Sequence, residues 1–399
     1  MRCPECRQQT ADVGPFCVGC GAPTGVPGHP AAPGPRPAIW RRPEIIAFAA
    51  SVALISLLTA ITVISGKSGG PATRATPALQ ATSARWAYTT GSYIDTRPAV
   101  AGGTVYAGSD DGTVYALDAA TGGLRWTYTA GDSVSDPAVA GGTVYVGSMD
   151  FKVYALDAAT GGLRWTYTTG SYVLSSPTVA GGAVYVGSDD GKVYALDAAT
   201  GALHWAYTTG DVVESSPAVA GGTVYVGGHG GKVYALDAAT GRLRWAYTAA
   251  DMVDSSPAVA GGTVYVGGDD GKVYALDAAT GRLRWAYAAG GSVSDPAVAG
   301  GTVYVGGHGG RVSALDAATG RLRWTYATGD MVDWCPAVAG GAVYVVSHYG
   351  KVYALDAATG RLRWVYTTGI MPDSGPAAAR GTVYVGSEDN KVYALNAGS

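Results

Sequence analysis

Four of the five cysteines lie within the first 20 residues, in two pairs whose members are separated by two residues. The pairs are Cys3 with Cys6 and Cys17 with Cys20. Together they offer four thiolates, the ligand set that Zn²⁺ takes in tetrahedral structural sites. So short a segment has almost no apolar core, so bound metal would supply its folding energy. The spacing predicts a zinc site in residues 1–24, with a redox pair or a reduced, disordered tail as the alternatives.

A second set of chemically capable residues is acidic and precedes a series of regularly spaced prolines. Five carboxylates stand three residues before such a proline and two stand one residue before it: Asp95, Glu214, Asp254, Asp333 and Asp373, then Asp136 and Asp295. Carboxylates around one opening raise each other's pKa and concentrate negative potential. They predict a cationic partner, either Ca²⁺, a basic peptide or an amine-bearing envelope polymer. The alternative is that the acids are solvated and only keep the protein soluble.

The proline unit around Pro336 differs from the others in its aromatic and titratable residues. Trp334 and Cys335 replace the usual pair of serines, and His348 with Tyr349 replace small or acidic residues. Exposed Trp and Tyr side chains are typical anchors of protein interfaces. We therefore expect this unit to anchor a bound partner, with His348 giving a hydrogen bond.

A repeat of 39 or 40 residues must position all of these acidic and aromatic residues. Its most regular markers are the tryptophans at Trp86, Trp126, Trp165, Trp205, Trp245, Trp285, Trp324 and Trp364. Prolines and the run Val-Tyr-Ala-Leu-Asp recur in step with them. Eight units of this length indicate the blades of a propeller.

Each unit is predicted to contain four short strands. In the unit of Pro217 these are 217–219 (strand A), 223–227 (B), 232–237 (C) and 243–247 (D). β-branched and aromatic residues fill the strands, and glycines fill the turns between them. The fold class is therefore all-β, an eight-bladed β-propeller of four-stranded antiparallel blades. The repeat opens with a D-type strand, 85–88, which we expect to complete the last blade and close the ring.

The unit resembles the repeat of the pyrroloquinoline-quinone (PQQ) dehydrogenases and of their non-enzymatic relatives. Those relatives include the outer-membrane assembly lipoproteins and actinobacterial sensor propellers. The shared motif is Ala-x-Asp-x-x-Thr-Gly-x-x-x-Trp, seen here as Ala116, Asp118, Thr121, Gly122 and Trp126. The resemblance covers 84–399 and implies that the eight tryptophans dock between neighbouring blades as structural residues.

The resemblance leaves the activity open, because the repeat identifies a scaffold and not a cofactor. In the dehydrogenases a pair of adjacent cysteines commonly contacts the quinone, and long insertions interrupt the repeat. Here Cys335 is the only cysteine of the repeat region, and every unit keeps its length. We therefore expect no bound PQQ, no catalytic residue and no enzymatic activity.

The region before the propeller is predicted to anchor it in a membrane. A Pro/Gly-rich linker, 25–43, precedes a helix at 44–65, whose core Ile45–Ile64 carries no charge and is long enough to span a bilayer. Arginines precede this run, which places the N-terminus in the cytoplasm and the propeller outside. Residues 66–83 form a second linker. Residues 1–24 resemble the zinc ribbons found at the N-termini of bacterial membrane proteins.

The loops that vary between units, D–A and B–C, share one face of a propeller. We therefore expect a membrane-anchored, non-catalytic scaffold that binds an envelope ligand or protein there, although relaxed constraint would also explain the variation. The alternatives are a sensor signalling through the cytoplasmic zinc ribbon and a PQQ-dependent dehydrogenase. A net charge of −3 gives no sign of nucleic-acid binding.

Overall fold

The computed structural model describes residues 83–369 and 374–398, which form 32 strands and no helix. None of that part of the chain is a helix long and apolar enough to cross a lipid bilayer. The predicted zinc site, the predicted membrane helix and Asp373 lie outside the described residues.

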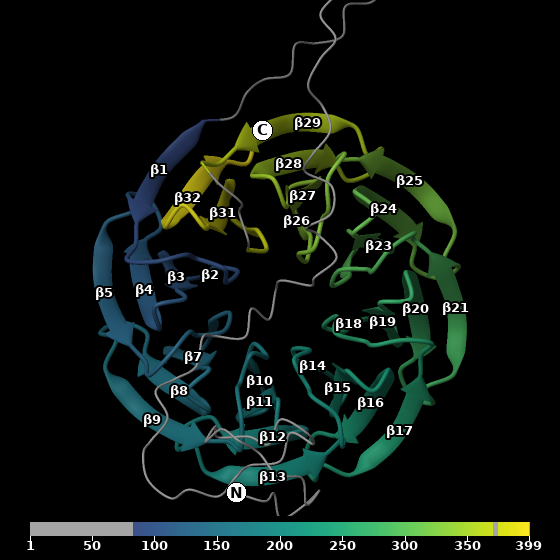
Figure 1. The fold of residues 1–399 in the computed structure, drawn as a ribbon, viewed down its shortest axis with the longest axis horizontal. Coiled ribbons are helices and arrows are strands. Elements are labelled where there is room, and N and C mark those ends of the chain that lie inside the picture. Colours follow the sequence, from purple (N-terminus) through teal and green to yellow (C-terminus); the bar gives the residue numbers. More distant parts are fainter. Residues whose placement is uncertain (1–82, 370–373, 399) are drawn as a thin grey trace, which may run out of the picture. The chain divides into compact units, whose positions relative to one another are not determined.

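The strands form eight separate four-stranded antiparallel sheets, which confirms the predicted eight-bladed propeller (Figure 1). Blades one to four are β2–β5 (Ala99–Ala101, Thr104–Gly108, Thr113–Asp118, Leu124–Thr129), β6–β9 (Ala138–Ala140, Thr143–Gly147, Lys152–Asp157, Leu163–Thr168), β10–β13 (Thr178–Ala180, Ala183–Ser188, Lys192–Asp197, Leu203–Thr208) and β14–β17 (Ala218–Ala220, Thr223–Gly228, Lys232–Asp237, Leu243–Thr248). Blades five to seven are β18–β21 (Ala258–Ala260, Thr263–Gly267, Lys272–Asp277, Leu283–Ala288), β22–β25 (Ala297–Ala299, Thr302–Val305, Arg311–Asp316, Leu322–Ala327) and β26–β29 (Ala337–Ala339, Ala342–Ser347, Lys351–Asp356, Leu362–Thr367). Blade eight joins β30–β32 (Ala377–Ala379, Thr382–Ser387, Lys391–Asn396) to β1 (Ala84–Thr89).

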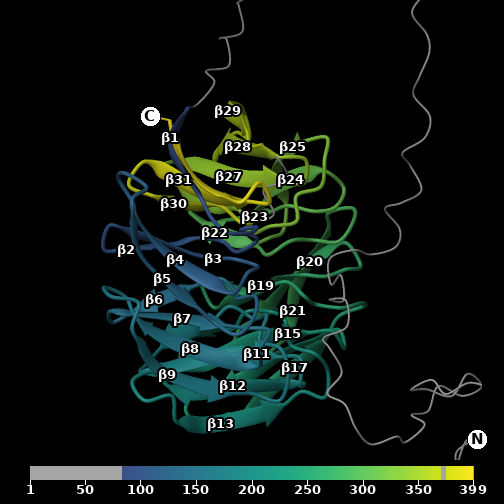
Figure 2. The same ribbon diagram turned by 60° about the vertical axis from the view of Figure 1, so that its left-hand side comes forward.

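The ring closes through β1, as predicted from the ends of the repeat. This strand pairs antiparallel with β32, from Ala84 opposite Leu395 to Thr89 opposite Lys391. In both views β1 lies beside the last blade, although more than 300 residues separate the two strands (Figure 1 and Figure 2). The pairing covers an edge of β32 that would otherwise be open to another chain.

The observed strands follow the predicted ones closely, and the main difference lies at strand A. In blade four that strand is Ala218–Ala220, one residue later than predicted. Pro217 lacks the N–H that a ladder bond requires, so pairing begins only after it.

Pairing in each blade divides its four connections between two faces of the ring. In blade four, Thr223 lies opposite Asp237 and Leu236 opposite Leu243, so the A–B and C–D turns share one face. At the other strand ends Gly228 lies opposite Lys232, so the B–C turn shares a face with the D–A loop. We call these the turn face (A–B and C–D turns) and the loop face (B–C turns and D–A loops).

Tryptophans from strand D connect successive blades at the turn face. The Nε1 atom of Trp126 donates to the carbonyl of Ala158 in the next blade at 3.1 Å, and Tyr106 Oη donates to the same carbonyl at 3.0 Å. Gly161 of that next turn has φ +73°, and a Cβ there would lie 2.6 Å from the Trp126 ring. The C–D turn must therefore carry glycine at this position for the blades to pack together.

Candidate binding face

The loop face brings acidic and histidine side chains within 4 Å of each other at two places. His229, in the B–C turn of blade four, lies 3.4 Å from Glu214 in its own blade and 3.3 Å from Asp254 in the next. These contacts raise the pKa of His229, and the largest cause is the hydrogen bond that Glu214 accepts from the imidazole. The predicted acids Glu214 and Asp254 are therefore neighbours that share one histidine.

Asp333 occupies a similar position on the other side of the same face. One carboxylate oxygen lies 3.2 Å from Nε2 of His308, and the other lies 3.8 Å from Nδ1 of His348. The predicted hydrogen-bonding residue His348 is thus already engaged with an acid of its own blade. Asp95 also lies on this face, in the D–A loop of blade one, where it is half-buried.

One acid of this face is held in an environment that disfavours its charge. Burial raises the pKa of Asp189 to about 6, and Glu214 adds to the shift while His229 opposes it. Asp189 stands at the first position of the B–C turn in blade three, where blade four has His229. A carboxylate with little solvent and an acidic neighbour keeps its proton to a higher pH.

The residue just before each blade proline forms a second, inner set along the channel. Its members are Arg97, Asp136, Ser176, Ser216, Ser256, Asp295, Cys335 and Gly375. Neighbouring members bond to one another: Ser176 N–H donates to Ser216 Oγ at 2.9 Å, and Ser256 N–H donates to Asp295 Oδ1 at 2.7 Å. Asp136 and Asp295 therefore belong to this inner set, whereas Asp95, Glu214, Asp254 and Asp333 stand three residues before their prolines and do not.

Arg97 is the charged centre of the inner set. Its N–H donates to Asp136 Oδ1 at 2.9 Å, and its Nε lies 3.7 Å from Asp136 Oδ2. Burial raises the pKa of Asp136 and of Asp295, and the positive charge of Arg97 opposes both shifts. Because Asp136 and Asp295 come from blades two and six, on opposite sides of the ring, Arg97 offsets charge across the channel.

Cys335 also belongs to the inner set and is a poor nucleophile. Burial raises the pKa of its thiol to about 11, and Arg97 opposes that shift only in part. Its Sγ donates to the carbonyl of Pro336 at 3.5 Å. At neutral pH the group is therefore the thiol, and the thiolate is the reactive form.

Four of the predicted acids, Asp136, Glu214, Asp254 and Asp333, thus have basic partners within the protein, which sequence reasoning missed. It missed Arg97, His229, His308 and Asp189, although a comparison of the eight units position by position would have found each one. The structure also shows that the predicted acids form two sets and not one ring. Over the described residues no three His, Cys, Asp or Glu side chains are grouped as metal ligands.

Even with these partners the loop face keeps an excess of negative charge. Its described carboxylates are Asp95, Asp110, Asp111, Asp132, Asp136, Asp150, Asp189, Asp190, Asp211, Glu214, Asp251, Asp254, Asp269, Asp270, Asp295, Asp330, Asp333, Glu388 and Asp389. Its described lysines and arginines are Arg97, Lys152, Lys192, Lys232, Lys272, Arg311, Lys351 and Lys391. Nineteen acids against eight bases leave about eleven negative charges when histidine is neutral.

The loop face also carries the exposed aromatic side chains of the described chain. Tyr93, Phe151 and Tyr349 are 49%, 41% and 69% exposed, and all three lie in D–A loops or B–C turns. Phe151 packs on Tyr172 at a ring distance of 5.2 Å. The predicted anchor Trp334 is half-buried because it packs against the core of the last two blades. Tyr349 is therefore the more accessible of the two predicted anchors.

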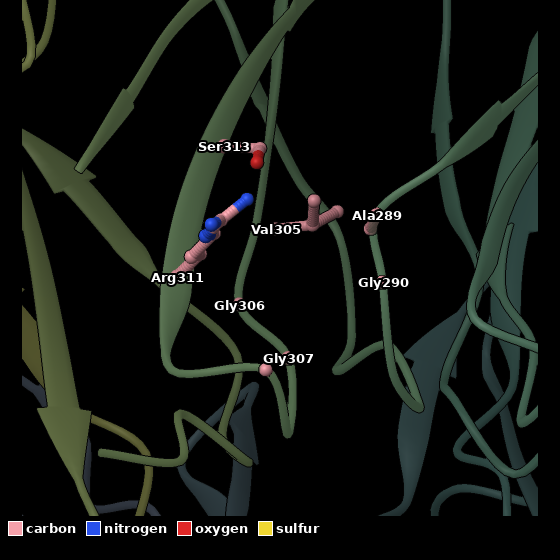
Figure 3. Close-up of a pocket in the computed structure, with 8 residues that line it drawn as sticks. Ala289, Gly290, Val305, Gly306, Gly307, Arg311 and Ser313 are labelled. Atoms are coloured by element: carbon pink, nitrogen blue, oxygen red, sulfur yellow. The ribbon is translucent and has the colours of Figure 1, made fainter. Parts of the chain in front are cut away.

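A small gap between blades five and six has no room for a ligand. It is lined by Ala289, Gly290, Val305, Gly306, Gly307, Gly309, Arg311 and Ser313, and it does not admit a water molecule (Figure 3). Ser313 stands where the other seven blades carry a strand C tyrosine, such as Tyr274. The missing ring accounts for the gap, which is a packing feature.

Comparison with known proteins identifies the family of the repeat. The model described as "Outer membrane protein assembly factor BamB" matches residues 61–150, 132–253, 248–335 and 308–399. No curated protein sequence matches the chain.

Solved structures share the fold at low sequence identity. BamB from Moraxella catarrhalis is 23% identical, with a TM-score of 0.68 over 79% of this chain and 99% of that one. The computationally designed protein Ika8 is 20% identical, with a TM-score of 0.70 over 77% and 97%. A europium-containing methanol dehydrogenase is 18% identical, with a TM-score of 0.68 over 79% and 93%. One fold therefore serves an assembly factor, a designed protein and an enzyme.

Proposed function

Because the chain belongs to the PQQ-repeat family of the outer membrane protein assembly factor BamB, we propose that it is a non-catalytic scaffold that binds a protein partner in the cell envelope. The observation that carries the proposal is the loop face, where Tyr93, Phe151 and Tyr349 are exposed on loops that differ from blade to blade. Aromatic side chains on loops held by a rigid frame are typical of binding surfaces. The excess of acid on this face favours a partner with a basic surface.

Two features of the channel favour the scaffold over a PQQ-dependent dehydrogenase. Arg97 and its acidic partners occupy the inner set of the channel, and Cys335 is a single thiol with a pKa of about 11. The likeness to the methanol dehydrogenase is one of fold, at 18% identity. A shared propeller does not carry the enzyme's chemistry with it.

We also propose that the N-terminal region anchors the propeller to the membrane. The uncharged run Ile45–Ile64 supplies a helix, and the arginines before it favour a cytoplasmic N-terminus with an extracytoplasmic propeller. Cys3, Cys6, Cys17 and Cys20 would then hold Zn²⁺ in the reducing cytoplasm. The alternative role, a sensor, would use the same arrangement with the zinc ribbon as its cytoplasmic output.

A crosslinking capture from intact membranes tests the binding face. We expect Tyr93→Ala combined with Tyr349→Ala to reduce partner capture about tenfold, because exposed aromatics contribute much of the energy at such interfaces. The matched control is Leu124→Ala with Leu163→Ala, which removes two apolar side chains of the turn face that are 49% and 51% exposed. Equal losses from both variants, or none from the tyrosine variant, would assign the partner to another surface.

A further inference from the structure

The turn face carries a rim of exposed basic and apolar side chains. These side chains have no part in the partner binding proposed for the loop face. In blades four to seven an arginine and a leucine follow each C–D turn. We call these residues the Arg–Leu rim: Arg242 with Leu243, Arg282 with Leu283, Arg321 with Leu322, and Arg361 with Leu362. The first three leucines are 46–47% exposed, although they begin the outermost strands of a folded domain.

The four rim arginines differ from the arginines that stand two residues later in the same blades. Arg244, two residues after Arg242, donates to Asp237 Oδ2 at 2.7 Å and so completes an ion pair within its blade. Arg242 instead donates its backbone N–H to Thr240 Oγ1, and its side chain is exposed. Within the described residues none of the four rim guanidinium groups forms an ion pair. Their charges therefore remain free to meet a partner.

The rim gives the turn face a charge opposite to that of the loop face. The basic residues of the whole turn face are Arg85, Arg125, Arg164, Arg242, Arg244, Arg282, Arg284, Arg321, Arg323, Arg361, Arg363 and Arg380. Its acids are Asp118, Asp157, Asp197, Asp237, Asp277, Asp316 and Asp356. Twelve arginines against seven aspartates leave about five positive charges, while the loop face is strongly negative. A negatively charged surface would attract one face and repel the other.

The chain enters the propeller on this same turn face. Ala84 pairs with Leu395, at the end of strand C, so the described chain begins at the turn-face end of blade eight. The predicted linker of residues 66–83 separates this point from the apolar run. A flexible linker of 18 residues has an average span of about 20–25 Å, so a membrane anchor would hold the turn face close to the bilayer.

We propose that the Arg–Leu rim docks on the anionic lipid surface of the membrane that anchors the protein, and that the loop face thereby points away from the bilayer. The proposal rests on the membrane anchoring proposed above. Guanidinium groups pair with lipid phosphates, and leucines and arginine stems enter the interfacial region. Docking would present the loop face to partners in a fixed orientation, with less entropy to lose on binding.

Hydroxyl-radical footprinting of the full chain in vesicles tests this orientation with native side chains. The full-length protein is reconstituted in phosphatidylcholine vesicles with or without 30% phosphatidylglycerol, roughly the anionic content of a charged membrane surface. We expect oxidation of Leu243, Leu283 and Leu322 to fall about fivefold with the anionic lipid and to recover in 1 M salt, where the Debye length is about 3 Å. Oxidation of Tyr349 should stay unchanged.

The matched variant replaces the four rim arginines with alanine, the residue that blade three carries there as Ala202. This variant should lose the protection while it keeps the wild-type melting temperature. The control is Lys232→Ala, Arg311→Ala and Lys351→Ala on the loop face, which should keep it.

Three outcomes would overturn the proposal. Unchanged leucine oxidation in a protein that is inserted in the vesicles would contradict docking but leave the membrane anchor in place. Protection of Tyr349 would show that the loop face, and not the turn face, lies on the membrane. A chain that fails to float with vesicles would remove the anchor and the docking together. Partner capture through Tyr93 and Tyr349 remains a separate measurement.

Discussion

The turn face and the loop face are built from the same repeat, yet they differ in how much each position is allowed to vary. On the turn face Asp237, Thr240 and Gly241 recur with little change, and each makes the same contacts in its blade. On the loop face the corresponding turn holds His229 in one blade, Asp189 in another and His348 in a third. The first face joins the blades through the same contacts in every unit, and on the second the contacts between blades differ from one unit to the next.

The contacts explain this difference in constraint. Asp237 Oδ1 accepts hydrogen bonds from Thr240 N–H at 2.9 Å and Thr240 Oγ1 at 2.8 Å, and Gly241 lies against Trp205 of the preceding blade. A change at one of these positions therefore disturbs a turn and an interface between blades. At the loop face, side chains contact one another through ion pairs that several residue types can make. Duplicated units can diverge there without loss of the ring.

A pair of glycine substitutions tests whether the two faces differ in constraint, and should give the largest effect. Gly241 has φ +70° and a Cβ there would lie 2.6 Å from Trp205, whereas Gly210, in a D–A loop with φ +89°, has no heavy atom within 4 Å of such a Cβ. We expect Gly241→Ala to cost about 3 kcal/mol from backbone strain and overpacking, and Gly210→Ala about 1 kcal/mol from strain alone. Urea unfolding midpoints measure both. Equal midpoints would show that the turn face has no special packing requirement.

The same difference decided what could be predicted from the sequence. The blades, the ring closure and the strand boundaries follow from residues that recur every 39 or 40 positions, so their roles are local and repeated. The arrangement of acids could not be predicted in the same way. Asp136 and Asp295 stand one residue before their prolines, the position that Arg97 holds in blade one, and the structure places this position along the channel. The electrostatic interaction between Arg97 and Asp295 acts across the channel, and its strength depends on the diameter of the channel, which no local pattern encodes.

The channel offers a second test, because its charges depend on contacts across the ring. Arg97→Gln leaves Asp136 and Asp295 without their cation, which should lower the free energy of unfolding by about 1–2 kcal/mol. The expected loss of unfolding free energy is modest because the Arg97 and Asp136 side chains are 44% and 27% exposed, so water screens their charges. Adding Asp136→Asn and Asp295→Asn should restore most of the loss. Arg311→Gln, an exposed change on the same face, is the control, and a triple variant weaker than the single one would show that the acids do not repel each other.

The smallest effect distinguishes the two faces by the direction of their pH dependence. Asp189 on the loop face has a pKa raised to about 6 by burial and by Glu214, so its folded form keeps a proton that the unfolded chain releases above about pH 4. Stability from this group is full below pH 4 and falls as the pH rises to about 6. Asp237 on the turn face has a pKa lowered to about 2, first by Arg244 and then by Thr240, so its stability is full above about pH 4 and falls towards pH 2.

Asparagine variants at these two positions should therefore respond in opposite ways. Asp189→Asn should stabilise the protein at pH 7 by about 1 kcal/mol, discounted for solvent contact, and change little at pH 4. Asp237→Asn should destabilise it at pH 7, with the difference from wild type shrinking below pH 4 as Asp237 itself becomes protonated. Thermal unfolding from pH 3 to pH 8 measures both. If the two variants shift the melting temperature in the same direction at pH 7, the loop face does not disfavour the charged form of its acids. Its excess of negative charge would then no longer argue for a basic partner.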